Sequence, residues 1–416
     1  MEIVNTCIIG GGAAGMMAAI VLARAGISVT ILEKNEKTCK KLYITGKGRC
    51  NLTNDCLPQE FLNNVVNGAK FLRSSIYRFT SQDTMAFFED MGVELIVERG
   101  NRVFPKTEKS ATITDALRNE IKKLNVNVEL NAPVIEIKKD DIFHIKCGNG
   151  LKVDAKNVLL CTGGMTYPLT GSTGDGYTIA KQFGHTIVTP VGGLNSIVLK
   201  EDVKSLEGVS LKNVKLFAYA PKRIAAEFGE MLFTSNGVSG PIALTISSLI
   251  NRLDNVELVL DLKPALDEET LNARILREIE DRKNLDIKNV VRSMMPEKLV
   301  HYVLKEAKID ETKKANSITK EERIRLYQTI KGIRFHVKKL SPIEEAVITS
   351  GGVSTNEINP GTMESKLVNG LYFAGEIIDV DALTGGFNLQ IAFATAQSAA
   401  NAIIKNNNVE ENAWLI

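Results

Sequence analysis

The sequence has few of the residues that mark metal or disulfide chemistry. It contains four histidines and six cysteines in 416 residues, with no C-x-x-C pair and no cluster of cysteine with histidine. This scarcity argues against a zinc site and against a dithiol redox centre. Cys7 and Cys161 lie in apolar runs typical of strands, so we expect them to be unreactive thiols of a protein core.

An excess of charge of one sign is also missing. The chain has 51 Lys and Arg against 49 Asp and Glu, and it has no long basic run with interleaved aromatic residues. Nucleic acid is therefore not expected as a main partner.

Hydrophobic runs suited to a membrane are absent as well. The most apolar stretches, residues 7–25 and 391–404, are rich in Gly and Ala, and the second is too short to span a bilayer. Glu2 stands where a secretory signal would carry a cation. We therefore expect a cytoplasmic protein with no membrane partner.

What the sequence does contain is a glycine turn of the form G-x-G-x-x-G, made by Gly10, Gly12 and Gly15. A strand-like run precedes the turn, an alanine-rich helix pattern follows it, and a second apolar run, residues 29–32, ends at Glu33. In such a βαβ unit the first glycine makes the turn, the second leaves room for a pyrophosphate, and the third lets the helix pack on the strand. The helix N-terminus binds the phosphates, and the acid accepts hydrogen bonds from the ribose hydroxyls. The pattern predicts an adenine dinucleotide site.

The residues after Glu33 bear on which dinucleotide is bound. A nicotinamide domain would normally continue the alternation of strands and helices, whereas residues 40–54 form a long polar segment with Gly46, Gly48 and Arg49. Glycines permit close backbone approach to a cofactor that extends beyond the pyrophosphate, and Arg49 can pair with a phosphate or a reduced ring. A solvated basic loop fits the same residues equally well.

The end of the chain favours a flavin. Residues 371–376 predict a buried strand that ends in Gly375 and Glu376, and a glycine pair then opens an alanine-rich helix. An acid at a strand tip followed by such a helix start is typical of a site for a ribityl chain and a flavin pyrimidine edge. The helix N-terminus near Asn388 would face the charge that develops at the ring on reduction.

With these motifs in view, the chain resembles, over essentially its whole length, the bacterial NAD(P)/FAD-dependent oxidoreductases grouped with aminoacetone oxidase and the 3-dehydro-bile-acid Δ4,6-reductase. The matching segments are residues 45–54, 161–168, 171–177, 233–241 and 349–390. The resemblance implies an α/β fold, with a Rossmann-type, glutathione-reductase-like FAD-binding domain, an inserted β-rich module and a helical module. One departure is Lys47, which stands where the family loop usually has a third glycine.

The cofactor-binding residues follow in part from the motifs and in part from this resemblance. They are Gly10, Gly12, Ala13, Ala14, Gly15, Glu33, Lys34, Lys41, Gly46, Gly48, Arg49, Asn51, Val134, Thr162, Gly163, Gly375, Glu376, Asp379, Asn388, Leu389 and Gln390. The catalytic residue stays open. The candidates for proton transfer are Arg49, Tyr167, His336 and Asp379, and each also has an ordinary structural explanation. No histidine lies in the 45–54 segment, so we expect non-covalent FAD.

Changes in residue pattern predict the domain boundaries. The FAD-binding domain comprises residues 1–190 and 342–416. Between them we expect a β-rich module at 191–262, a helical module at 263–331 and a strand at 332–341 that returns to the β-rich module.

The sequence thus predicts a FAD-dependent oxidoreductase that transfers hydride through flavin N5 between NAD(P)H and a small organic substrate held between the FAD domain and the inserted module. There is no second dinucleotide motif, so the nicotinamide donor would bind transiently. Three alternatives stay open: an oxygen-dependent oxidase of a small amino compound, a reductase of a conjugated enone such as a 3-oxo bile acid, and a FAD-carrying sensor without turnover. The sequence determines neither the substrate, nor the choice among NADH, NADPH and oxygen, nor the oligomeric state.

Overall fold

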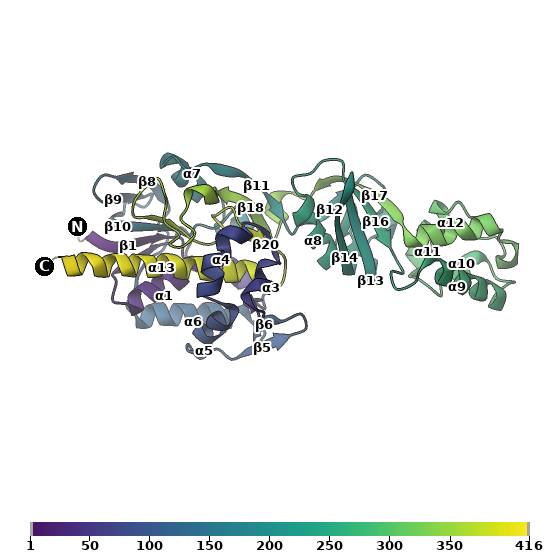
Figure 1. The fold of residues 1–416 in the computed structure, drawn as a ribbon, viewed down its shortest axis with the longest axis horizontal. Helices are drawn as coiled ribbons and strands as arrows, with labels where there is room; N and C mark the ends of the chain where they lie inside the picture. Colours follow the sequence, from purple (N-terminus) through teal and green to yellow (C-terminus); the bar gives the residue numbers. More distant parts are fainter. Residues whose placement is uncertain (1–2, 414–416) are drawn as a thin grey trace. The chain divides into compact units, whose positions relative to one another are not determined.

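The computed structural model describes the backbone of residues 3–413 and the side chains of residues 3–407. The chain divides into two compact units, each with its own hydrophobic core. Unit 1 comprises Met1–Gly192 and Ile343–Ile416, and unit 2 comprises Gly193–Pro342 (Figure 1). Unit 2 is therefore an insertion in the chain of unit 1.

A seven-stranded sheet forms the centre of unit 1. Its parallel strands are β7 (Asn127–Glu129), β2 (Val29–Leu32), β1 (Ile3–Ile9), β10 (Lys152–Leu160) and β19 (Leu371–Phe373). Its antiparallel extension consists of β9 (Phe143–Cys147) and β8 (Val134–Lys139). Strands covered on both faces are apolar throughout, and all four residues of β2 are buried accordingly.

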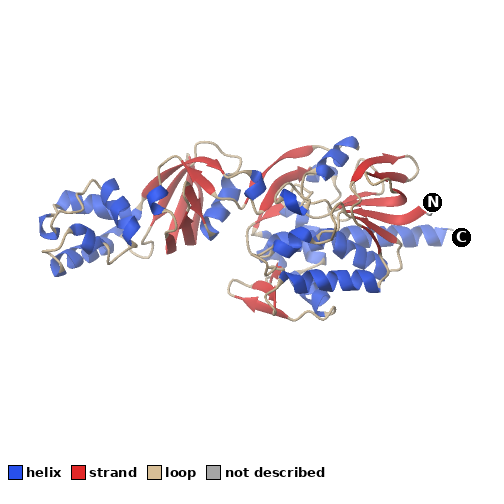
Figure 2. Ribbon diagram, turned by 180° about the vertical axis from the view of Figure 1, so that it is seen from behind, coloured by secondary structure: helices blue, strands red, loops and turns tan. Residues whose placement is uncertain are grey.

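Three helices run side by side in unit 1 (Figures 1 and 2): α1 (Ala13–Arg24), α6 (Ser110–Lys123) and α13 (Phe387–Ala413). Residues 14–20 of α1 are all buried, because this helix is apolar on every side and lies inside the unit. The central position of α1 holds its N-terminus firmly at the end of β1.

Smaller elements complete unit 1. The paired strands are β3 (Thr53–Asn54), β6 (Arg102–Pro105) and β5 (Leu95–Glu98); β4 (Val65–Asn67) with β20 (Asp381–Ala382); and β11 (Ile187–Gly193) with β18 (Ile348–Val353). The helices are α2 (Lys40–Ile44), α3 (Pro58–Leu62), α4 (Ala69–Arg78), α5 (Ser81–Glu89) and α7 (Asp175–Gln182). The pairing of β4 with β20 joins two segments more than 300 residues apart in sequence.

Unit 2 consists of a closed β-barrel and a helical group (Figure 2). The barrel strands, in order, are β12 (Ile197–Leu199), β15 (Gly237–Ser239), β14 (Lys222–Phe233), β13 (Ser210–Ala220), β16 (Glu257–Asp261) and β17 (Ile333–Leu340). The helices are α8 (Pro241–Ile250), α9 (Glu268–Asp281), α10 (Ile287–Val291), α11 (Glu297–Glu306) and α12 (Lys320–Lys331). The predicted fold class, with a β-rich and a helical insertion in a Rossmann-type domain, is confirmed.

All six cysteines are free thiols in buried positions. Burial raises the pKa of the Cys7 and Cys161 thiols, which makes them poor nucleophiles. Among residues 3–413, no helix is both long and apolar enough to cross a membrane. The same described residues contain no group of three His, Cys, Asp or Glu side chains placed to hold a metal ion.

Candidate functional site

The turn between β1 and α1 explains each glycine of the first motif. A Cβ on Gly10 would lie 2.4 Å from the Cys161 carbonyl oxygen, and one on Gly15 would lie 2.0 Å from the Gly10 oxygen. Close packing therefore requires these two glycines. Around Gly12, in contrast, no described atom lies within 4 Å of the Cβ position. The open space lies at the start of α1, where free N–H groups and the helix dipole favour an anion.

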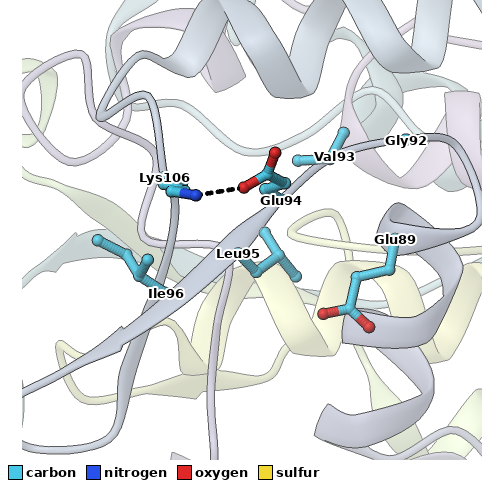
Figure 3. Close-up of a pocket in the computed structure, with 7 residues that line it drawn as sticks. All are labelled: Glu89, Gly92, Val93, Glu94, Leu95, Ile96 and Lys106. Atoms are coloured by element: carbon cyan, nitrogen blue, oxygen red, sulfur yellow. Dashed lines mark hydrogen bonds and ion pairs between the residues drawn. The ribbon is translucent and has the colours of Figure 1, made fainter.

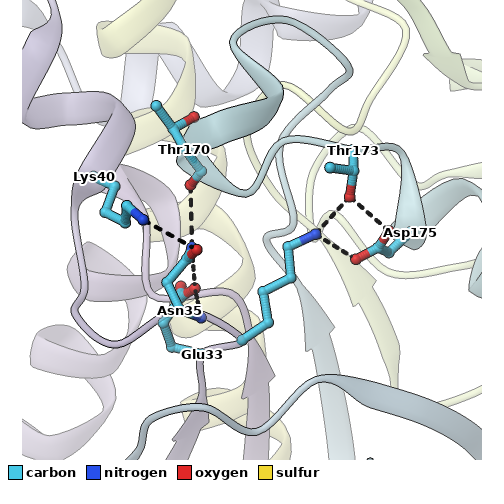
Figure 4. A network of polar contacts seen from close by, with 7 residues as sticks. Glu33, Asn35, Lys40, Thr170, Thr173 and Asp175 are labelled. Atoms are coloured by element: carbon cyan, nitrogen blue, oxygen red, sulfur yellow. Dashed lines mark hydrogen bonds and ion pairs between the residues drawn. The ribbon is translucent and has the colours of Figure 1, made fainter.

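Glu33 lies at the end of β2, beside this turn. Its buried carboxylate accepts a hydrogen bond from the Gly11 N–H at 2.8 Å. It also accepts from the backbone N–H and Nδ2 of Asn35 at 2.9 and 2.7 Å (Figure 4). An ionised carboxylate has about four acceptor positions. The side chain is thus fixed in place and retains acceptor capacity for ribose hydroxyls.

The segment 171–177 packs against the end of β2. The Lys34 Nζ lies 2.5 Å from both Thr173 Oγ1 and Asp175 Oδ2 (Figure 4). Burial opposes ionisation of Asp175, but the bonds from Lys34 and Thr173 outweigh it and lower the pKa of this carboxyl. Gly171 has a φ of +100°, and a Cβ there would lie 2.5 Å from Asn35 Nδ2. The segment 171–177 therefore lies beside the predicted dinucleotide site, and it holds Lys34 in place.

A second polar cluster lies at the end of β19. Glu376 accepts hydrogen bonds from Lys41 Nζ at 2.7 Å and from the Thr349 N–H at 2.8 Å. Lys41 also donates to Thr166 Oγ1 at 2.7 Å. A Cβ on Gly163 would lie 3.9 Å from Glu376 Oε2, which brings the 161–168 segment to the same place. The structure thus unites three predicted residues, Lys41, Gly163 and Glu376.

Gly375 connects the two halves of the site. Its φ is +79°, and a Cβ there would lie 3.1 Å from the Ala14 Cβ and 3.7 Å from the Ala392 Cβ. The end of β19 therefore touches both α1 and α13. An extended ligand that runs along this contact can meet the N-termini of both helices.

The start of α13 is fixed by the 45–54 segment. Gly386 has a φ of +98°, and a Cβ there would lie 2.3 Å from the Thr53 carbonyl oxygen. The Asn51 amide, oriented by its hydrogen bonds, accepts from the Gly386 N–H at 3.0 Å and donates to the Thr53 oxygen at 3.2 Å. Asn51 therefore joins the loop to the helix start.

The side chains of Asn388 and Gln390 are occupied inside the protein. The Asn388 amide bonds to the backbone of Ala382 at 3.0 and 2.7 Å. Gln390 accepts from Thr53 Oγ1 and Thr84 Oγ1, each at 2.7 Å, and its nitrogen donates to two backbone carbonyls. The Gln390 N–H donates to the Gly386 oxygen at 3.2 Å, so a cofactor contact at this helix start falls to the backbone N–H groups that precede Gln390 in the first turn of α13.

Arg49 is held by two acids of unit 1. Its Nη2 donates to Glu98 and, at 3.0 Å, to Glu108, and its guanidinium lies 4.3 Å from the centroid of the Phe104 ring. The bond to Glu98 raises the pKa of Arg49. A contact of Arg49 with FAD stays a prediction.

The other candidates for proton transfer are spread over the chain. Asp379 accepts from Asn67 Nδ2 at 2.7 Å, close to the strand pair of β4 and β20. Tyr167 is partly exposed and has a φ of +53°. His336 lies on β17 of unit 2, with Nδ1 2.7 Å from Glu201. Val134 begins β8.

Two buried hydroxyls lack a partner inside the protein, one from the predicted set and one outside it. The Tyr177 hydroxyl and Thr162 Oγ1 have no hydrogen-bond partner within the described part of the chain. Burial, followed by the nearby Glu376 and Asp379 carboxylates, raises the pKa of Tyr177. Thr162 belongs to the set that the resemblance implies, whereas Tyr177 lies in the matching segment 171–177 but is not in that set. Unpartnered polar atoms, an open glycine turn and two free helix N-termini fit a large polar ligand such as FAD.

A surface hollow elsewhere in unit 1 does not share these residues. It is lined by Glu89, Gly92, Val93, Glu94, Leu95, Ile96 and Lys106 (Figure 3). An ion pair of 2.5 Å between Lys106 and Glu94 crosses one side of it. None of the predicted cofactor residues lines this hollow, so we assign it no part in the reaction.

Comparison with known proteins identifies close relatives along the whole chain. Residues 4–402 match the family model described as HI0933-like protein Rossmann domain. The chain is 30% identical over 414 residues to a protein of Escherichia coli K12 named ribosomal RNA dihydrouridine synthase, covering 97% of this chain and 99% of that protein. It is 28% identical over 402 residues to a 3-dehydro-bile acid delta(4,6)-reductase of Clostridium scindens, covering 95% and 98%.

A solved structure supports the fold alone. The 3-ketosteroid delta1-dehydrogenase of Sterolibacterium denitrificans has a TM-score of 0.52 at 13% identity, with 98% of this chain and 100% of that chain covered.

Proposed function

The chain belongs to the HI0933-like Rossmann-domain family of FAD-binding oxidoreductases, and we propose from this that it reduces a carbon–carbon double bond conjugated to a carbonyl group, with uracil rings of ribosomal RNA as its substrate and NAD(P)H as its donor. The predicted family is thus confirmed. The donor and the substrate are the proposal.

One observation carries the proposal. Two relatives that match nearly the whole chain have names that describe the same kind of chemistry. A dihydrouridine differs from uridine by a saturated C5–C6 bond, which in uracil is conjugated to the C4 carbonyl. A delta(4,6)-reductase of a 3-dehydro-bile acid likewise saturates double bonds conjugated to the 3-oxo group. In uracil, a hydride adds to C6, the carbon remote from the C4 carbonyl, and a proton adds to C5, the carbon beside that carbonyl.

We place RNA ahead of a small enone for two reasons. A second relative with the name ribosomal RNA dihydrouridine synthase, from Haemophilus influenzae, is 30% identical over 404 residues and covers 95% of this chain and 97% of its own. In addition, the net charge differs between the two units, since unit 2 has more basic than acidic residues and unit 1 has more acidic than basic ones. The proposal departs from the expectation that nucleic acid is not a main partner.

The residues of unit 1 would hold the cofactor, and the cofactor supplies two-electron hydride transfer when it is bound. Free N–H groups at the start of α1 would bind the pyrophosphate, with Glu33 accepting from the ribose. The first turn of α13 would stabilise negative charge at the flavin pyrimidine edge. Lys41 and Glu376 would fix the ribityl chain between these helix ends.

The test uses the purified yellow protein under argon. We expect NADH or NADPH to bleach the flavin, and a ribosomal RNA transcript made in vitro to reoxidise it with the formation of dihydrouridine, measured by mass spectrometry of the nucleosides. The reaction balances as NAD(P)H plus one proton plus uridine, giving NAD(P)⁺ and dihydrouridine.

Other outcomes separate the alternatives. Reduction of a 3-oxo-4,6-diene steroid acid without any change in RNA would replace RNA by a small enone. A flavin that is bleached by a small amine and by neither nicotinamide would indicate an oxidase. A flavin that none of these compounds reduces would contradict an enzymatic role.

A further inference from the structure

The barrel of unit 2 has one face that presents aromatic and basic side chains together. Along β13, Leu216 and Ala218 are buried in the core, so the intervening Phe217 and Tyr219 point outward. The neighbouring strand β14 presents Phe228, which is 60% exposed and lies opposite Lys215. We call the outward side of β13 and β14 the barrel face.

The aromatic rings of this face are arranged as a platform. Phe217 and Tyr219 have ring centroids 6.5 Å apart and planes inclined by 31°. Lys215 Nζ lies 5.3 Å from the centroid of the Phe217 ring. Aromatic side chains at successive outward positions of a strand can each stack on one base of a single strand, and a cation beside them can meet the phosphate.

The positive charges of the face are available. Within the described residues, Lys212, Lys215, Lys222 and Arg223 form no ion pair with a carboxylate, whereas the acids of the neighbouring β16 are occupied. Glu257 bonds to Arg334 at 2.7 Å and Asp261 to Lys331 at 2.6 Å. On β13 and β14, the exposed acid is Glu230, near the C-terminal end of β14.

The charge of the whole unit agrees with this local picture. Residues 193–342 contain 26 Lys and Arg against 21 Asp and Glu, while the rest of the chain contains 25 against 28. Unit 2 therefore carries a formal charge of +5 and unit 1 a formal charge of −3. A polyanion is attracted to unit 2 and repelled by unit 1.

We propose that the barrel face binds a single-stranded segment of RNA, with bases stacked on Phe217, Tyr219 and Phe228 and phosphates paired with Lys215, Lys222 and Arg223. The proposal rests on the proposed function, since it assigns the RNA substrate a place on unit 2. Apolar exposure alone would suit a second copy of the chain equally well. The unpaired cations beside the rings favour RNA, because a second copy would bring the same positive charge.

The experiment measures binding of a fluorescent uridine-rich RNA 12-mer to the full-length FAD-loaded protein by anisotropy. Phe228→Ala and Tyr219→Ala should each weaken binding by about 5- to 150-fold, the range seen when one stacked base loses its aromatic partner. Lys222→Gln combined with Arg223→Gln should weaken binding and lower the slope of log K against log salt by about 1.4. All these variants should keep the wild-type rate of flavin reduction by nicotinamide.

Matched controls and contrary results complete the design. Leu253→Ala removes an apolar side chain of unit 2 that is 43% exposed, and Lys320→Gln removes an exposed cation at the start of α12, so neither should change RNA affinity.

Dihydrouridine formation by the wild type with unchanged RNA affinity in the face variants would overturn this proposal and leave the proposed function intact. Variants that change self-association in sedimentation and leave RNA affinity unchanged would assign the face to a second copy. Absence of both RNA binding and dihydrouridine formation in the wild type would contradict both proposals.

Discussion

At the scale of single residues, the sequence predicts those positions whose role depends on near neighbours. Gly10, Gly12 and Gly15 follow from their spacing in the turn between β1 and α1, although the atom that excludes a Cβ at Gly10 belongs to the distant Cys161. The partners of Arg49 and Gln390 could not be predicted in this way. Arg49 meets acids about 50 to 60 residues away, and Gln390 bonds to Thr53 and Thr84 from more than 300 residues away. Such contacts depend on the packing of the complete unit.

Glu33 offers a direct test of the adenosine site. Replacement by Ala removes the ribose acceptor and should weaken FAD binding by about 30- to 150-fold, equivalent to about 2–3 kcal/mol. It also leaves the buried Gly11 N–H without its acceptor, so the melting temperature of the FAD-free protein should fall. Glu33→Gln, which keeps one oxygen, should give an intermediate affinity.

The affinity is measured by titration of the FAD-free protein with flavin. Glu36→Gln is the control, because Glu36 is a nearby exposed acid paired with Lys40. Unchanged FAD affinity in Glu33→Ala would show that this βαβ unit does not bind the adenosine half.

At the scale of elements, long apolar strands and amphipathic helices are predictable, and short paired strands are not. The composition of β2 and α1 predicts these two elements, because each is apolar over several successive positions. The strands β12 and β15 have three residues each, and their place in the barrel depends on pairing of Ile197 with Val238 and with Leu340. No local pattern specifies partners at such separations.

His185 couples the end of α7 to the segment before β19 and predicts a pH effect on stability. Its buried ring lies 3.2 Å from Glu357 Oε2 through Nδ1 and 2.8 Å from Ser365 Oγ through Nε2. Burial lowers the pKa of His185 below its ordinary value of 6.5, although Glu357 opposes the shift. The unfolded chain then binds more protons than the folded chain just below pH 6.5, so stability should fall as the pH drops through this range.

The measurement is the melting temperature between pH 8 and pH 5. We expect His185→Gln, which cannot titrate, to show a smaller decline than the wild type on acidification. Asn316→Gln, which changes an exposed side chain without a titratable group, is the control and should leave the shape of the curve unchanged. An identical decline in His185→Gln would mean that another group is responsible.

At the scale of the whole molecule, the total composition hides a difference in net charge between the two units. The near balance of 51 basic and 49 acidic residues is the sum of a basic unit and an acidic one. Only the boundaries of the units reveal this, and they depend on contacts that bring distant segments together. The ends of unit 2 are an example, since Asn195 Nδ2 donates to the Ser341 oxygen at 2.7 Å and the Ser341 N–H donates to the Ser196 oxygen at 3.0 Å.

Because these ends are hydrogen-bonded to each other, unit 2 can be removed without stretching the chain. We join Gly192 to Ile343 through a short Gly/Ser linker, which keeps all of β11 except its last residue, Gly193, and leaves β18 complete. The predicted cofactor contacts all lie in unit 1, so the shortened protein should still bind FAD and pass electrons from nicotinamide to an artificial dye. It should lose formation of dihydrouridine in RNA, because the proposed RNA-binding face is gone. Flavin absorbance, dye reduction and nucleoside mass spectrometry measure the three properties separately. If the shortened protein keeps its full kcat/KM for RNA, unit 1 alone must recognise the substrate.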